Sequence, residues 1–97
     1  MIEIQWVKLK KICEELVGKK VHIQASTDIS TEYRSGVIAK EDEVDIIINF
    51  NLIKRLESVI NALAHELAHV VLKTEDDALI GGEWLKLKKE IKRLYRG

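Results

Sequence analysis

The sequence predicts a single α+β domain with the order helix, three-stranded sheet, two helices. Three observations carry this prediction. Apolar residues recur at helical spacing over residues 2–17, apolar and polar residues alternate in short segments between residues 21 and 50, and neither glycine nor proline interrupts residues 51–72. A chain of 97 residues is long enough for one small core, so we assign residues 1–97 to one domain.

The first element is an amphipathic helix over residues 2–17. Lysines and glutamates separate its apolar residues, and Gly18 stands where a helix C-cap is expected. Cys13 falls on the apolar face, so we interpret it as a small core residue. Because it is the only cysteine, an internal disulfide is excluded.

Three strands follow. The segments VHIQAST (21–27) and VDIIINF (44–50) alternate as half-buried strands do, and RSGVIAK (34–40) is a third candidate. The acidic turn Glu41-Asp42-Glu43 joins the last two segments. We therefore expect a hairpin within a sheet of about three strands.

Two helices are predicted in the C-terminal half. Residues 51–72 are too densely apolar for a surface helix, and Thr74 and Asp77 have the spacing of a capping box. The last helix would therefore start at Thr74 and run through Tyr95, packed against its predecessor as a helical hairpin.

The overall composition limits the partners. Sixteen basic and 16 acidic residues balance, which gives no reason to expect a nucleic acid or an anionic membrane as partner. The N-terminus lacks the uninterrupted apolar run of a signal peptide, and no run reaches transmembrane length. We expect a soluble, cytoplasmic protein without a membrane span.

The chemistry of the sequence lies in the motif His65-Glu66-Leu67-Ala68-His69. Residues four apart on a helix lie on one face, so both imidazoles can point at one tetrahedral zinc ion. Glu66 is displaced by about 100° from His65, where a carboxylate can reach a metal-activated water without becoming a ligand. Glu66 would then take the proton of that water and pass it to a leaving amine.

An alternative interpretation of the motif, without a metal, is a pair of histidines that face solvent. Apolar residues surround the motif on nearly every side, however, which is typical of a buried helix. Burying two imidazoles and a carboxylate without partners costs several kcal/mol, whereas a metal satisfies them together. The pattern therefore predicts a zinc site held by His65 and His69.

A third ligand must come from downstream acids. In a hairpin turning at residues 73–74, His69 lies opposite residues near 78 and His65 opposite residues near 82, which favours Glu83, with Asp77 or Asp76 as alternatives. Gly81 and Gly82 also suggest a close approach of the two helices. The competing interpretation makes Glu83 a first-turn residue of a helix that begins at these glycines.

With HELAH at 65–69 and a glutamate on the following helix, the chain resembles the gluzincin class of zinc metallopeptidases. Its size and order of elements are similar to the minigluzincins, minimal zincin-like scaffolds related to catalytic domains of integral-membrane metallopeptidases such as CAAX prenyl proteases. The resemblance implies His65, His69 and Glu83 as zinc ligands, the last on a C-terminal glutamate helix, and Glu66 as general base. Two departures are a short spacing from His69 to Glu83 and Leu87 in place of a frequent acidic residue.

The resemblance also implies a latent enzyme whose cleft is covered by a terminal segment, here the basic tail of residues 88–97. That tail can equally be a solvated helix end or take part in self-association. Tyr33, Tyr95 and His22 are possible oxyanion donors, and residues 34–40 could offer an edge strand to a peptide substrate. The leading prediction is a zinc endopeptidase. Alternatives are a non-catalytic zinc module and a helical interaction domain without metal.

Overall fold

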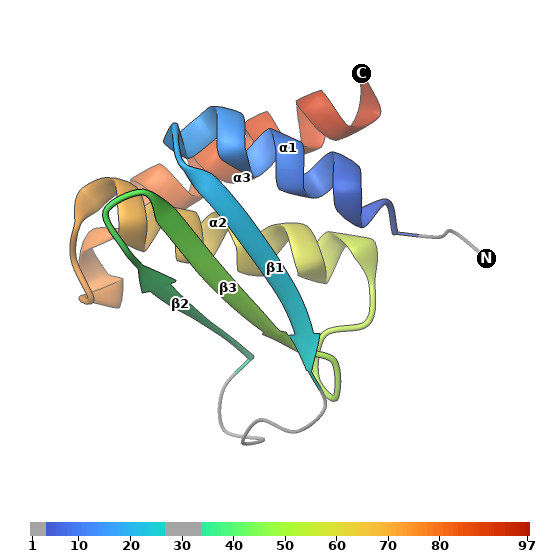
Figure 1. Ribbon diagram of the computed structural model, residues 1–97, viewed down its shortest axis with the longest axis horizontal. Coiled ribbons are helices and arrows are strands. Elements are labelled where there is room, and N and C mark those ends of the chain that lie inside the picture. The colour runs from blue at the N-terminus through green and yellow to red at the C-terminus, as the bar shows by residue number, and fades with distance from the viewer. Residues whose placement is uncertain (1–3, 27–33) are drawn as a thin grey trace.

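The computed structural model describes residues 4–26 and 34–97 of the chain (Figure 1). The order of elements is the predicted one, with an additional short 3-10 helix before the last helix. The elements are α1 (Trp6–Val17), β1 (Lys20–Ser26), β2 (Ser35–Ala39), β3 (Glu43–Asn49), α2 (Leu56–Leu72), η1 (Asp77–Leu79) and α3 (Gly81–Arg96). The predicted α+β class and layout are thus confirmed.

Helix α1 ends as its sequence indicates. Gly18 adopts the left-handed conformation at φ 68°, and its N–H donates to the carbonyl of Glu14 at 2.9 Å. Cys13 is fully buried, which confirms its interpretation as a core residue. Within the described residues the helix begins at Trp6, and the backbone N–H of Gln5, just before it, donates to the hydroxyl of Tyr95 on α3 at 3.1 Å. The first residues of the predicted helix, 2 and 3, lie outside the described residues.

The sheet is mixed, with strand order β1-β3-β2. Strand β3 lies in the centre, parallel to β1 and antiparallel to β2, so the predicted hairpin of β2 and β3 is present. Val44, Ile46 and Ile48 of β3 are buried in alternation, as a strand with one face on the core requires. Strand β2 is left at one edge of the sheet.

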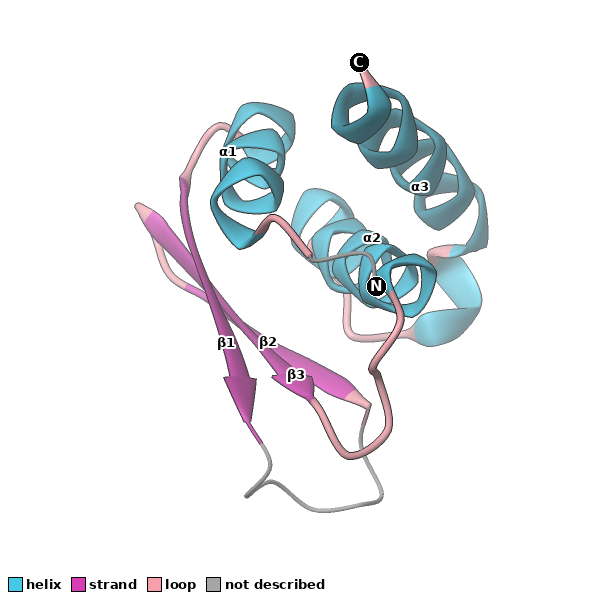
Figure 2. Ribbon diagram, turned by 90° about the vertical axis from the view of Figure 1, so that its right-hand side faces the viewer, coloured by secondary structure: helices cyan, strands magenta, loops and turns pink. Residues whose placement is uncertain are grey.

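All three helices lie on one side of the sheet (Figure 2). Helices α1 and α2 pack directly against the strands, while α3 packs on α1 and α2 as a further layer. Helix α2 is therefore enclosed, and its residues Leu63, Ala64, Leu67 and Ala68 are fully buried. This confirms that the apolar density of the segment marks a buried helix.

Helix α2 begins five residues later than predicted. The side chain of Asn49 accepts a hydrogen bond from the backbone N–H of Asn51 at 2.9 Å, and the Asn49 carbonyl accepts from Ile53 at 2.9 Å. These bonds close a turn in which the chain reverses after β3. Helix α2 begins after this turn, at Leu56.

The predicted helix start at Thr74 is wrong. The Thr74 hydroxyl accepts from the N–H of Asp76, two residues ahead, and the Asp76 carboxylate accepts from the N–H of Ala78. These local bonds replace the capping box and cap η1 instead of a long helix. Helix α3 then starts at Gly81.

The expected close approach at the glycine pair is also wrong. A Cβ built on Gly81 or Gly82 would meet no atom within 4 Å. Both residues stand in the first turn of α3, where no helix crosses them. The apolar stripe of α3 is confirmed further along, where Leu87 and Ile91 are buried. None of the helices in the described ranges is both long and apolar enough to cross a membrane.

Candidate metal centre

The two motif histidines lie one turn apart on α2, and their Nε2 atoms are 3.2 Å apart. The side chain of His69 is 13% exposed and that of His65 is 36% exposed. Their rings meet edge to face, with centroids 4.8 Å apart. The structure therefore brings the two imidazoles together on one face of α2, as the four-residue spacing predicts.

The ring orientation of His69 is fixed by the turn after α2. Its Nδ1 lies 2.8 Å from the carbonyl oxygen of Thr74. A carbonyl only accepts hydrogen bonds, so Nδ1 carries the proton that is donated there. In the neutral ring the lone pair is then on Nε2, the tautomer of a metal ligand whose other nitrogen is held by a backbone oxygen.

Asp77 completes the group. Its Oδ1 lies 2.9 Å from Nε2 of His69 and 3.3 Å from Nε2 of His65. In the described part of the chain these three residues are the one set with the spacing of metal ligands. At tetrahedral zinc with bonds of about 2.0–2.1 Å, neighbouring ligand atoms are about 3.3 Å apart. The observed separations of 2.9, 3.2 and 3.3 Å fit a zinc-sized cation.

Glu83 is not part of this group. The predicted register of α2 and α3 is nearly right, because Nε1 of Trp84 donates to the carbonyl of Asn61 at 3.0 Å and its indole lies 6.5 Å from the His65 ring. Trp84 therefore takes the place facing α2, and Glu83 is rotated by about 100° from it. Glu83 stands in the first turn of α3, where a carboxylate complements the helix dipole.

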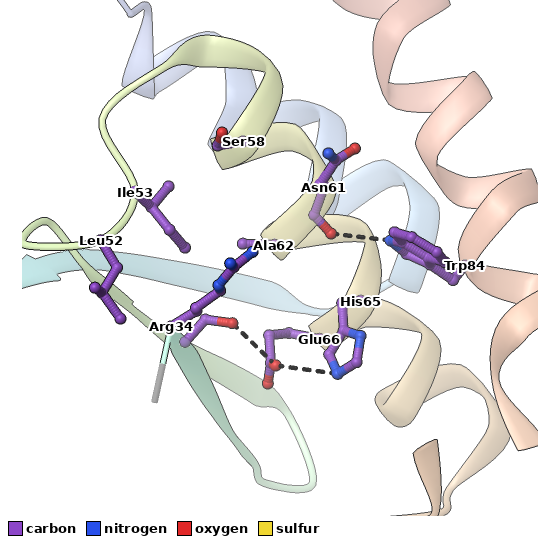
Figure 3. A pocket seen from close by; sticks show the side chains of 10 residues that line it. Arg34, Leu52, Ile53, Ser58, Asn61, Ala62, His65, Glu66 and Trp84 are labelled. Carbon is purple, nitrogen blue, oxygen red and sulfur yellow. Dashed lines mark hydrogen bonds and ion pairs between the residues drawn. The ribbon is translucent and has the colours of Figure 1, made fainter. Parts of the chain in front are cut away.

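Glu66 is buried beside the histidines. It is 5% exposed, its Oε1 accepts a hydrogen bond from the Ser35 hydroxyl at 3.2 Å, and the same oxygen lies 4.0 Å from Nε2 of His65 (Figure 3). Burial raises the pKa of Glu66, against the opposing effects of His65, the Ser35 hydrogen bond and His69. A carboxylate in this environment can take up a proton more readily than an exposed one.

Two cavities meet at Glu66. One, of about 420 Å³, is bounded by the start of β2 and by α2, and its lining includes Arg34, His65 and Trp84 (Figure 3). The other, of about 790 Å³, runs along β2 past Val37 to the end of α2. Both are open to solvent, and β2 lines both. The site therefore has the form of a cleft along an edge strand, with Glu66 in its middle.

The other residues singled out in the sequence lie elsewhere. His22 is on β1, where its Nε2 lies 3.6 Å from Glu43, and Tyr95 is on α3 against Gln5. Neither is among the residues lining the two cavities, and Tyr33 falls outside the described residues. Strand pairing and helix packing bring three further residues to the site, namely Arg34, Ser35 and Trp84. No local sequence motif predicts their position.

The basic C-terminal tail continues as helix. Residues 88–96 belong to α3, where Ile91 is buried and Lys92 donates to Glu57 at 3.0 Å. The described residues 88–97 line neither of the two cavities at Glu66. In this structure the tail is thus the end of a helix that packs on the core through Ile91, Leu94 and Tyr95, away from the two cavities.

Comparisons with models of known protein families, with characterised proteins and with solved structures give no match for this chain.

Proposed function

We propose that this protein is a zinc-dependent endopeptidase in which His65, His69 and Asp77 bind the metal and Glu66 is the general base. The proposal is carried by the three ligand atoms, whose separations of 2.9, 3.2 and 3.3 Å match those around tetrahedral zinc. A lone pair on Nε2 of His69 directed at a carboxylate oxygen needs a cation or a proton between them. Glu83 remains the alternative third ligand.

In the proposed reaction the metal and Glu66 have different roles. Zinc, when bound, would supply Lewis acidity and lower the pKa of water to about 7. Glu66 accepts the proton of the attacking water and returns it to the leaving amine. The raised pKa of Glu66 suits this exchange, because it makes the carboxylate a stronger proton acceptor than an exposed one.

The shape of the cleft supports a peptide as substrate. Strand β2 pairs with β3 on one side only, and cavities open at both of its ends. An extended peptide can therefore add to β2 through backbone hydrogen bonds, with side chains entering the cavities. This arrangement would pass the peptide backbone over Glu66, which Ser35 of the same strand holds in place.

Zinc content and peptide hydrolysis, measured on the same preparations, test the proposal. The purified chain should bind about one zinc, His65→Ala should lose it, and Glu66→Gln should keep zinc while losing hydrolysis of casein or a fluorogenic peptide. Glu57→Gln is the matched control, since Glu57 is an exposed carboxylate on the same helix. Zinc-free protein, or hydrolysis that persists in Glu66→Gln, would overturn the proposal.

A structural zinc is the second candidate. Asp77 stands on η1 and the histidines on α2, so a metal would clamp the end of α2 to the following turn. In that case zinc removal would lower the unfolding temperature, and Glu66→Gln would change no measurable reaction. The enzyme proposal differs in requiring turnover that depends on Glu66.

A further inference from the structure

The cavity of about 420 Å³ beside Glu66 is lined by a cation, Arg34, that forms no ion pair with any described residue. Figure 3 shows the side chain of Arg34 extending from the residue just before β2 toward Ala62 of α2. Among the described residues no carboxylate lies within ion-pair distance of the Arg34 guanidinium. Other cations of the chain do have such partners, for example Lys40 with Asp45 at 3.3 Å.

The position of Arg34 is fixed by the sheet. Its backbone carbonyl accepts from the N–H of Asn49 on β3 at 2.8 Å, directly before β2 begins. Ser35, the next residue, bonds to Glu66. The backbone of Arg34 is thereby fixed directly before the strand that would carry the substrate, one residue from the contact to the proposed general base.

The remaining walls suit a side chain with an apolar stem and a charged end. Leu52 and Ile53 come from the turn before α2, and Trp84 closes the cavity from α3. Methylene groups can pack on these side chains while a carboxylate reaches the guanidinium, whose planar fork matches two carboxylate oxygens.

We infer that this cavity is a specificity pocket in which Arg34 selects peptide substrates carrying an acidic side chain, glutamate above all, next to the scissile bond. The inference rests on the proposed peptidase function. An ion pair at an exposed arginine changes binding by about twofold to fivefold, and a bidentate one by more. The expected preference for glutamate over glutamine is therefore about fivefold or greater.

The test uses zinc-loaded full-length protein and a fluorogenic peptide series that places Glu, Gln or Lys at each of the two residues on either side of the cleaved bond. At one position, kcat/KM should be highest for Glu and lowest for Lys. In Arg34→Gln, kcat/KM should be equal for the Glu and Gln peptides. In Arg34→Glu, kcat/KM should be highest for the Lys peptide. Arg55→Gln, which removes an exposed arginine outside the cavity, should keep the preference of the wild type.

Equal turnover of the three peptides by the wild type, or a preference for Glu that persists in Arg34→Glu, overturns the inference. If the wild type cleaves no peptide, the peptidase proposal fails and fluorescence anisotropy of the same labelled peptides decides the inference separately. Tighter binding of the Glu peptide that is lost in Arg34→Gln supports the pocket. Binding that ignores charge, or its absence, refutes it.

Discussion

Nε2 of His69 lies 2.9 Å from Oδ1 of Asp77, and this contact joins the last turn of α2 to η1. Separate hydrogen bonds position each of the two residues. Thr74 fixes the imidazole through Nδ1, and the Asp76 cap shapes the turn that presents Asp77. The carboxylate nearest the two histidines thus comes from the connection between the two helices rather than from the second helix itself.

Replacing Asp77 by asparagine should therefore weaken zinc binding most among the nearby acids. We expect Asp77→Asn to lower affinity by more than the about 10- to 100-fold that loss of an outer hydrogen-bonding partner costs. Glu83→Gln is the matched control and should stay close to wild type. Competition with a chromophoric chelator measures both. A larger loss in Glu83→Gln than in Asp77→Asn would restore Glu83 as the ligand.

The sequence was sufficient to predict the fold class and the side-by-side placement of His65 and His69, because both depend on local patterns. Alternation along β3 and apolar density along α2 depend on neighbours within one element, and so does the four-residue spacing of His65 and His69. Each pattern acts through the geometry of a regular strand or helix. The predicted elements and the position of the two imidazoles accordingly agree with the structure.

The start of the last helix could not be predicted from the sequence, because alternative local hydrogen bonds compete for the same side chain. Thr74 and Asp77 have capping-box spacing, yet the Thr74 hydroxyl bonds to the N–H of Asp76 and starts a different turn. That choice moves the start of α3 to Gly81 and brings Asp77 to the histidines. The role of Ser35 could not be predicted either, because its contact partner Glu66 lies 31 residues away in the sequence.

Ser35→Ala should impair catalysis without affecting the metal. The Ser35 hydroxyl donates to Oε1 of Glu66 at 3.2 Å, and loss of one such hydrogen bond costs about 1 kcal/mol, or about fivefold. We expect kcat to fall by about that factor while KM and zinc content stay constant. Ser35→Thr keeps a hydroxyl and should recover much of the activity. An unchanged kcat in Ser35→Ala would show that Glu66 does not depend on this bond.

Cys13 should resist thiol reagents in the folded protein. It is fully buried, and burial, followed by the charge of Glu14, raises the pKa of its thiol from 9.0 to about 12. At pH 8 the thiolate needed for reaction is nearly absent. Ellman's reagent should therefore react only at the rate of unfolding, and fully in guanidinium. Rapid labelling of native protein would contradict the placement of α1.

The same burial gives the protein a dependence of stability on alkaline pH. Because the folded pKa lies above the unfolded one, the folded state binds the Cys13 proton more tightly, so the contribution is complete below pH 9 and is lost as pH rises toward 12. The slope approaches about 1.4 kcal/mol per pH unit in that window. Urea unfolding of wild type and Cys13→Ala between pH 8 and 10.5 measures this contribution. The other titrating groups are the same in both proteins, so the difference between their free energies of unfolding should change with pH only through Cys13.

Gly82→Ala should stabilise the protein. Gly82 lies in the first turn of α3, has no left-handed backbone conformation, and a Cβ there would meet nothing within 4 Å. Alanine then restricts the unfolded chain and favours the helix without steric cost, which is worth about 0.4–1 kcal/mol. Gly18→Ala is the contrasting variant, because Gly18 has φ 68° and should lose stability. Urea midpoints that move in opposite directions for the two variants are expected. A loss of stability in Gly82→Ala would mean that the helices approach each other at this point after all.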